Sequence, residues 1–155
     1  MRILIDTHIL IWFLEGNSSL SKSRRQIIAA STNDVFVSIA SLWEMAVKIS
    51  IGKLTLAQPL ADVIKQIDLE NIEVSAILPE HILQVSTLPF HHRDPFDRII
   101  IAQAQIEKLQ VMSDDKEFST TILIYFKFKV PQFARSTTKL KKSSKLSSTI
   151  NQEFF

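Results

Sequence analysis

The stretch ILID at residues 3–6 joins a short apolar run to a single acid. Consecutive apolar residues are typical of a strand that is buried on both faces, and this strand is predicted over residues 2–5. Asp6 or Thr7 is suited to capping a helix that continues to Leu14. A strand that passes directly into a helix predicts an α/β unit, with an acid at the carboxyl end of the strand.

The alternation of strands and helices continues along the chain. Apolar runs predict strands at residues 2–5, 35–37, 72–76 and 109–112, and helical periodicity predicts helices at 7–14, 20–30, 38–51, 60–69, 79–88 and 95–108. Asp94 and Pro95 suit the cap and the first residue of the last helix. This order predicts a three-layer α/β fold with a mainly parallel sheet, as one domain at residues 1–130.

The composition is that of an ordinary globular protein. Of the 155 residues, 46% are hydrophobic and 22% are charged, which suits one domain with a substantial core. The longest unbroken apolar stretch, residues 9–14, is too short to cross a bilayer, and Asp6 and His8 interrupt the region where a secretory signal would be apolar. There is no cysteine, which excludes disulfides and thiolate metal sites. We expect a cytoplasmic protein with no membrane partner.

The scarcity of glycine excludes several common sites. Gly16 and Gly52 are the only glycines in the sequence. A phosphate-binding loop, a dinucleotide fingerprint and a Gly-x-Ser-x-Gly nucleophile elbow each need several glycines within a few residues. The four histidines do not form a His-Glu-x-x-His zinc helix. The chemistry of this chain must therefore rest on other groups.

Four acids lie where strands end or helices begin: Asp6, Glu44, Asp97 and Asp115. Ligand sites of parallel sheets form beyond the carboxyl ends of the strands, so we expect these side chains to share one crevice. Two carboxylates about 5 Å apart repel by about 3 kcal/mol at an effective dielectric of about 20. A divalent cation that prefers oxygen ligands, Mg²⁺ or Mn²⁺, is therefore the expected cofactor, and hydrolysis at phosphorus is the chemistry it suits.

Each acid also has a purely structural explanation. Capping of the first helix would by itself explain Asp6. Asp97 lies three residues after the predicted N-cap Asp94, where a negative charge interacts favourably with the helix dipole. Asp115 stands in a charged loop at residues 113–117. These interpretations remain open for each residue taken alone, whereas the joint pattern favours the metal site.

Glu44 has two structural alternatives of its own. With Ser41 it fits a capping box, and Lys48 lies four residues further on as an ion-pair partner. Arg98 is interpreted as a surface or ion-pair residue, with contact to phosphate as the alternative. The aromatic side chains at helical spacing are predicted to be core or dimer contacts rather than platforms for base stacking; they are Trp12, Phe13, Trp43 and Phe96.

Several stretches together resemble a known family. The matching text is LIDTH at residues 4–8, SIASLWE at 38–44, LPFHHRDPFDR at 88–98 and SDD at 113–115. Over about residues 2–119 the chain resembles PIN-domain ribonucleases, in particular the VapC-like toxins of type II toxin–antitoxin pairs.

The resemblance implies a PIN fold and an endonuclease that cleaves RNA with Mg²⁺ or Mn²⁺. Family acids with catalytic and metal-binding roles match Asp6, Glu44, Asp97 and Asp115. Ser113 stands where a helper hydroxyl usually lies, and Thr7 belongs to the matching stretch beside the first acid, so both are expected to support the site. The resemblance also implies a small antitoxin as partner and a homodimer.

The resemblance ends near residue 120. Members of this branch usually have Tyr after the Phe-Ser-Thr stretch and end soon afterwards, whereas here Thr121 takes that position. Residues 121–155 hold seven Lys/Arg and one Glu, a balance of +6. An edge strand is expected at residues 121–128. Residues 131–155 are expected to be a basic, disordered tail, either simply solvated or adding RNA affinity. A shifted reading frame is one hypothesis for the unusual sequence after residue 120, and resequencing the gene tests it.

Other classes of function compete with the nuclease. The main alternative is an inactive or decayed PIN-like module that binds RNA or an antitoxin without cleavage. A signalling receiver domain needs adjacent acids after the first strand, but Thr7 follows Asp6. A phosphatase of the Asp-x-Asp type needs an acid where His8 stands. The last two classes are therefore disfavoured.

Overall fold

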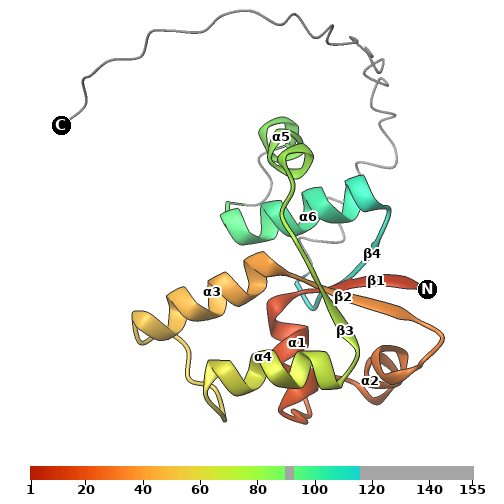
Figure 1. Ribbon diagram of the computed structural model, residues 1–155, viewed down its shortest axis with the longest axis vertical. Helices are drawn as coiled ribbons and strands as arrows, with labels where there is room; N and C mark the ends of the chain where they lie inside the picture. The colour runs from red at the N-terminus through yellow and green to blue at the C-terminus, as the bar shows by residue number, and fades with distance from the viewer. Residues whose placement is uncertain (90–92, 116–155) are drawn as a thin grey trace, which may run out of the picture.

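The computed structural model describes residues 1–89 and 93–115, which form a parallel sheet between two helical layers (Figure 1). The strands are β1 (Arg2–Ile5), β2 (Asp34–Ser38), β3 (Ile72–Ser75) and β4 (Gln110–Met112). The helices are α1 (Thr7–Leu14), α2 (Lys22–Ala29), α3 (Ile39–Ser50), α4 (Leu60–Leu69), α5 (Pro79–Thr87) and α6 (Pro95–Glu107). The strand order is β3-β2-β1-β4 and every pair is parallel. The predicted three-layer α/β fold is confirmed.

Some of the predicted segments fall outside the described residues. The edge strand at residues 121–128 and the basic tail at 131–155 both do, so they remain predictions, as does the domain boundary at residue 130. Within residues 1–89 and 93–115, no helix combines the length and the apolar character that crossing a membrane requires.

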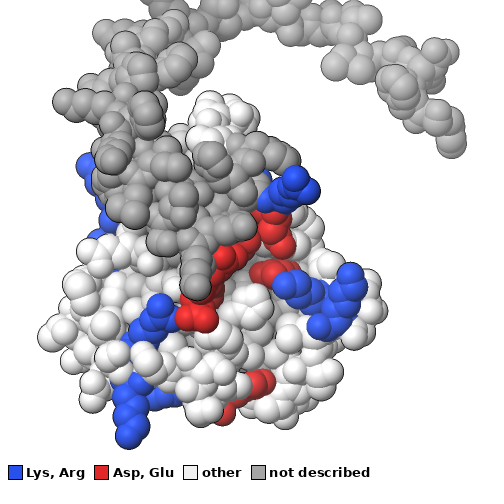
Figure 2. Space-filling view, turned by 180° about the vertical axis from the view of Figure 1, so that it is seen from behind, with Lys and Arg blue, Asp and Glu red and all other residues white. Residues whose placement is uncertain are grey.

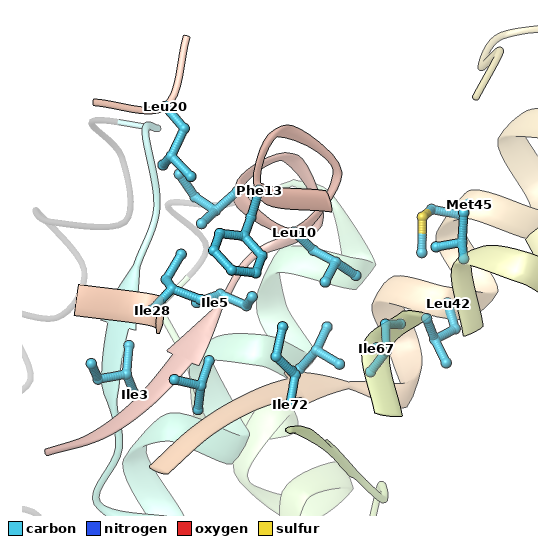
Figure 3. Packing of buried hydrophobic residues seen from close by; sticks show 14 residues of the cluster. Ile3, Ile5, Leu10, Phe13, Leu20, Ile28, Leu42, Met45, Ile67 and Ile72 are labelled. Atoms are coloured by element: carbon cyan, nitrogen blue, oxygen red, sulfur yellow. The ribbon is translucent and has the colours of Figure 1, made fainter. Parts of the chain in front are cut away.

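Alternate residues of β1 pack against opposite helical layers. Ile3 and Ile5 belong to a hydrophobic cluster built with α1, α2, α3 and α4 (Figure 3). Leu4 points to the other face, into a cluster built with α6 and the end of α5. All three side chains are almost completely buried. A central strand that is covered on both faces needs apolar residues at consecutive positions, which explains the unbroken run at residues 3–5.

Acidic side chains fix the starts of two helices. Asp6 is the N-cap of α1, because its Oδ1 accepts a hydrogen bond from Ile9 N at 2.7 Å. Thr7 is therefore the first helical residue and not the cap. Asp94 caps α6 through a hydrogen bond from the backbone two residues further on, at 2.8 Å. The predicted cap and first residue of α6 are confirmed.

Two helix starts differ from the prediction. The predicted capping box between Ser41 and Glu44 is wrong, because Ser38 caps α3 and Ser41 lies buried inside the helix. Helix α2 is shorter than the predicted span of 20–30 because the hydroxyl of Ser21 caps it and sets its first residue at Lys22. Both differences arise because several serines compete to cap each helix, and only the backbone conformation decides between them.

The strands β1 and β4 meet where the order of the sheet reverses. The chain runs from β1 to β2 to β3 in one direction and then returns to place β4 on the other side of β1. Ile5 pairs with Met112, and Asp6 N donates to Met112 O at 3.1 Å. Ligands of open α/β sheets bind at such a reversal, beyond the carboxyl ends of the strands. The residues that follow β1 and β4 therefore emerge side by side at the expected site.

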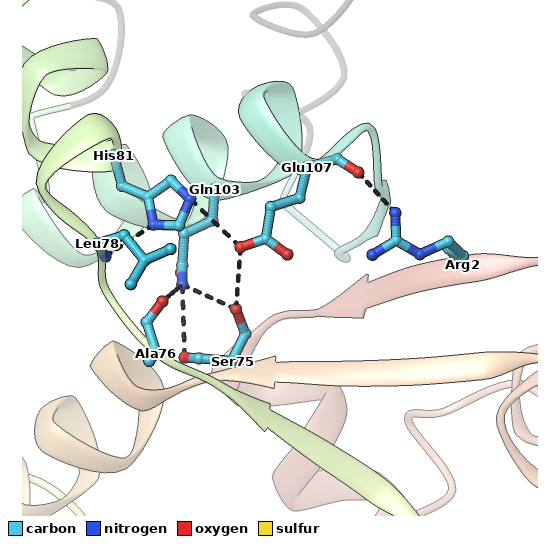
Figure 4. A network of polar contacts seen from close by, with 7 residues as sticks. All are labelled: Arg2, Ser75, Ala76, Leu78, His81, Gln103 and Glu107. Atoms are coloured by element: carbon cyan, nitrogen blue, oxygen red, sulfur yellow. Dashed lines mark hydrogen bonds and ion pairs between the residues drawn. The ribbon is translucent and has the colours of Figure 1, made fainter. Parts of the chain in front are cut away.

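A buried polar network fastens α5 and α6 to the sheet (Figure 4). His81 Nδ1 accepts a hydrogen bond from Leu78 N at 3.0 Å, which places the imidazole proton on Nε2. That atom lies 3.3 Å from Glu107 Oε1, within ion-pair distance but without the alignment of a hydrogen bond. Gln103 Nε2 donates to Ala76 O at 3.0 Å. These contacts hold α6 in place, and α6 carries one of the predicted site residues in its first turn.

Candidate active site

Asp6 and Ser113 lie side by side at the carboxyl ends of β1 and β4. The carboxylate of Asp6 is 5% exposed and accepts hydrogen bonds from Ile9 N and from the Ser113 side chain. Burial raises the pKa of Asp6 above its ordinary value of 3.8, and the nearby charge of Glu44 adds to the rise. The two hydrogen bonds and the charge of His8 act in the opposite direction without reversing it. Asp6 is thus a buried acid whose negative charge is incompletely compensated.

The loop after β4 is held at two points. Ser113 Oγ accepts a hydrogen bond from Asp115 N at 3.0 Å, so this hydroxyl connects Asp6 with the loop that carries Asp115. On α2, Arg24 forms an ion pair with Asp114 at 2.9 Å. The pair is exposed and contributes little to stability. Its position nevertheless ties α2 to the segment next to the predicted site.

Glu44 is buried on α3 with both carboxylate oxygens in contact. Thr7 Oγ1 donates to Oε2 at 2.5 Å, and Lys48 Nζ lies 2.5 Å from Oε1. The hydrogen bond from Thr7 joins residues 37 positions apart and therefore brings α1 and α3 together. The ion pair with Lys48 agrees with the i,i+4 spacing noted in the sequence. The sequence did not indicate the contact with Thr7.

Asp97 stands in the first turn of α6, half-buried near the other acids. Burial is the main cause that raises the pKa of Asp97 from 3.8 to about 7. The negative charges of Asp94, Glu44, Asp115 and Asp6 raise it further, in that order. Since one carboxyl group responds to all the other predicted acids, the four belong to one electrostatic cluster. Asp94 joins this cluster in addition to its role as cap.

Acidic side chains are concentrated on one face of the molecule (Figure 2). Figure 2 shows Asp and Glu side chains in a band across this face, with Lys and Arg side chains beside it. Within the described residues, no three His, Asp or Glu side chains are arranged to hold a metal ion. Mutual repulsion keeps carboxylates apart unless a cation lies between them. Hard oxygen donors are nevertheless the ligands that Mg²⁺ and Mn²⁺ prefer, so the donor set fits these ions.

Arg98 anchors α5, a role that the sequence did not indicate. Its guanidinium donates to the carbonyl oxygens of Val85 at 2.9 Å, Leu88 at 3.1 Å and Pro89 at 3.1 Å. These are carbonyls at the C-terminal end of α5, where a positive charge is favourable. An arginine in the first turn of one helix predicts contact with the end of the preceding helix only weakly. Which carbonyl oxygens it reaches depends on how α5 and α6 pack.

The four predicted aromatic contacts divide into two kinds. Phe13 is buried in the core, and Trp12 packs against the same cluster. Trp43 is 62% exposed and contacts the ring of Phe96 edge-on at 5.1 Å between centroids. Trp43 is therefore not a core residue, which corrects one branch of the prediction, and its packing joins α3 to the first turn of α6.

Replacing Asp97 with asparagine is expected to stabilise the metal-free protein at pH 8. The folded-state pKa of about 7 lies above the ordinary 3.8, so folding binds protons and wild-type stability falls as the pH rises from about 4 to about 7. Asparagine removes this penalty. Because Asp97 is half-buried and partly screened, the gain is on the order of 1 kcal/mol. Urea unfolding with chelator present, at pH 4.5 and pH 8, measures it.

The matched control for this change is Asp62→Asn. Asp62 occupies the same position in the first turn of α4, but it is exposed and pairs with Lys65. The control is expected to leave stability unchanged or to lower it slightly at both pH values. An Asp97 variant that is no more stable at pH 8 than at pH 4.5, relative to wild type, would contradict the electrostatic cluster.

The comparisons with known proteins agree with this geometry. The model of the PIN domain family matches residues 3–122, so the chain belongs to the PIN domain family. A comparison with curated proteins finds no match. The match of the family model confirms the resemblance to PIN-domain proteins that the sequence indicated.

Solved structures of VapC-containing proteins have a similar fold. VapBC2 from Rickettsia felis, bound to a DNA fragment from its promoter, is 15% identical with a TM-score of 0.58, covering 78% of this chain and 93% of that chain. VapBC-1 from nontypeable Haemophilus influenzae is 19% identical (TM-score 0.52; 80% and 94% covered). VapC20 from Mycobacterium tuberculosis, a toxin that cleaves the sarcin–ricin loop, is 18% identical (TM-score 0.52; 76% and 93% covered). At these identities the similarity concerns the fold.

Proposed function

We propose that this protein is a divalent-metal-dependent endoribonuclease and the toxin of a toxin–antitoxin pair. The observation that carries the proposal is the electrostatic coupling of Asp6, Glu44 and Asp115 to Asp97 at the carboxyl edge of a parallel sheet. Membership of the PIN domain family supports it, as does the similarity of fold to VapC proteins, one of which is a toxin that cleaves the sarcin–ricin loop.

The residues that would hold Mg²⁺ or Mn²⁺ are the four carboxylates, with Asp6 and Asp97 as the central pair. Both have a raised pKa, mainly because burial disfavours the charged carboxylate, and neighbouring acids raise it further. When bound, a divalent cation supplies Lewis acidity and positive charge for displacement at a phosphodiester. The acids are not arranged as a finished coordination group, so we propose that they move together when the ion binds.

The neighbouring hydroxyl groups have positioning roles. Thr7 directs Glu44 by donating to its Oε2. Ser113 donates to Asp6 and at the same time accepts from Asp115 N, so it holds two of the acids in a fixed relation. Rigid orientation of this kind reduces the reorganisation that a reaction requires. Thr7 and Ser113 are therefore proposed to support the acids by fixing their orientation.

RNA cleavage by the purified full chain tests the proposal. With Mg²⁺ or Mn²⁺ present, internal cuts in structured RNA are expected, and they are expected to disappear when a chelator is added and to return when the metal is restored. Absence of cleavage of tRNA, rRNA and mRNA with either metal would overturn the enzymatic proposal. Retention of these RNAs on the protein without cleavage would instead establish the inactive binding module.

The inactive module is kept as a second candidate because of one observation. No three acidic or imidazole side chains of the described residues are arranged to hold a metal ion.

The proposals about binding partners apply equally to the nuclease and to the inactive module. We infer a small antitoxin as partner from the similarity to VapBC proteins, and a homodimer from the family resemblance. Light scattering of the chain alone and of its mixture with a candidate antitoxin tests both.

A further inference from the structure

The acid cluster already contains a positively charged side chain. Lys48 lies one helical turn after Glu44 on α3, and its Nζ is 2.5 Å from Glu44 Oε1. The Lys48 side chain is about one-third exposed, whereas that of Glu44 is 6% exposed. Because Thr7 donates to Oε2 of the same carboxylate, both Glu44 oxygens have a close protein partner.

The charge of Lys48 also interacts with the acids of α6. The hydrogen bond with Glu44 is the main cause that raises the pKa of Lys48, against the opposing effect of burial. The charges of Glu44, Asp94 and Asp97 raise it further. The direct contact of Lys48 is with Glu44, and its charge also interacts with those of Asp94 and Asp97 at the start of α6. Glu44 and Asp94 also raise the pKa of Asp97.

We propose that Lys48 is the resident counter-cation of the acid cluster and that Mg²⁺ or Mn²⁺ must displace its ammonium group from Glu44 in order to bind. This inference rests on the proposed metal-dependent function. It assigns Lys48 as a positioning residue, which keeps Glu44 Oε1 in an ion pair until a metal ion takes its place. It also accounts for the finding that the described residues contain no finished metal-binding group.

The physical basis is competition between two cations for one carboxylate. An ammonium group in contact with Glu44 compensates a buried negative charge, which is costly when left alone. The metal ion must give up this compensation and must also overcome repulsion from the lysine. Removing the positive charge of Lys48 is thus expected to lower the stability of the metal-free protein and to increase its affinity for the ion. A ligand that binds only the folded state stabilises it more strongly the higher that affinity is, so the variant should also gain more stability from the metal.

Metal titration without RNA tests the inference. The full chain, its Lys48→Met and Lys48→Arg variants, and a Lys65→Met control are titrated with MnCl₂ by calorimetry, and the rise in melting temperature with Mn²⁺ is measured in parallel. Lys65 forms an exposed ion pair with Asp62 at 2.9 Å on α4, so it controls for the loss of one lysine and one ion pair.

The expected results differ between the variants. Lys48→Met is expected to bind Mn²⁺ about tenfold more tightly than wild type, which corresponds to about 1.4 kcal/mol, and to show the larger rise in melting temperature. Lys48→Arg, which keeps the charge, is expected to stay within about threefold of wild type, and Lys65→Met is expected to be unchanged. If Lys48→Met is too unstable without metal, Lys48→Gln gives the same comparison, because its neutral amide is able to donate a hydrogen bond to Glu44.

The contrary outcomes separate the two proposals. If wild type binds Mn²⁺ and the uncharged Lys48 variants bind it equally or more weakly, the competition is refuted while the metal-dependent function stands. If the wild type and the uncharged variants all fail to bind Mn²⁺ at millimolar concentration, the metal-dependent function and the competition fall together. A similar gain for Lys65→Met would show a general charge effect and would also refute the specific role of Lys48.

Discussion

Replacing Asp6 with asparagine is expected to lower the rate of RNA cleavage by about 10²-fold or more, the scale on which loss of one organised charged group acts in an active site. The fold should persist, because an asparagine oxygen can still accept the hydrogen bond from Ile9 N that caps α1. Asparagine also removes a buried charge, so the stability of the metal-free protein should not fall. Initial cleavage rates at saturating Mn²⁺, together with circular dichroism spectra and melting curves, measure these effects.

The matched control is Asp34→Asn, an identical substitution at an exposed residue that begins β2. This variant is expected to retain wild-type cleavage. Equal activity of the Asp6 and Asp34 variants would remove Asp6 from the mechanism and, with it, the proposed use of the cluster. Loss of activity in both variants would point to a general effect of charge on RNA binding.

The second large effect is expected from Leu4→Ala in the central strand. Leu4 is fully buried and packs in the cluster formed with Phe36, Ile100 and Ile101. Truncating a buried leucine leaves a cavity in addition to the lost transfer free energy. We expect a loss of about 3 kcal/mol, and a decrease of roughly 10 °C in melting temperature. Urea unfolding followed by circular dichroism measures the free energy.

Leu69→Ala serves as the control for this substitution. Leu69 ends α4 and is 78% exposed, so its truncation should change the free energy of unfolding by less than about 0.5 kcal/mol. If the two leucine variants differed by less than about 1 kcal/mol, the arrangement of β1 between two packed layers would be wrong. Because β1 also carries Asp6 at its end, Leu4→Ala should lose activity at temperatures where wild type is still folded.

The types of the elements were predictable because their signals are local. The run at residues 3–5 is apolar at consecutive positions because β1 is covered on both faces, and Asp94 with Pro95 marks the start of α6. The boundaries were less certain where several residues can cap the same helix, as at Ser38 and Ser41. Such choices depend on backbone angles that a list of residues does not contain.

The site was predictable in part. The positions of the four acids relative to strand ends and helix starts indicated the cluster, because a parallel sheet sends the carboxyl ends of its strands to one edge. The contact between Thr7 and Glu44 was not predictable, since it joins residues 37 positions apart. The role of Arg98 depended in the same way on where the end of α5 comes to lie.

The amino-acid sequence alone determined the alternation of strands and helices, and it excluded sites that need cysteine or several glycines. It also singled out the four acids, because each lies next to a predicted strand end or helix start. Only the tertiary structure decided that Ser113 bridges Asp6 and the backbone of Asp115, and that Glu44 is occupied from both sides. The physical reason is that charge interactions depend on distances through space. Those distances are set by the pairing of β1 with β4 and by the packing of α3 beside α1 and α6.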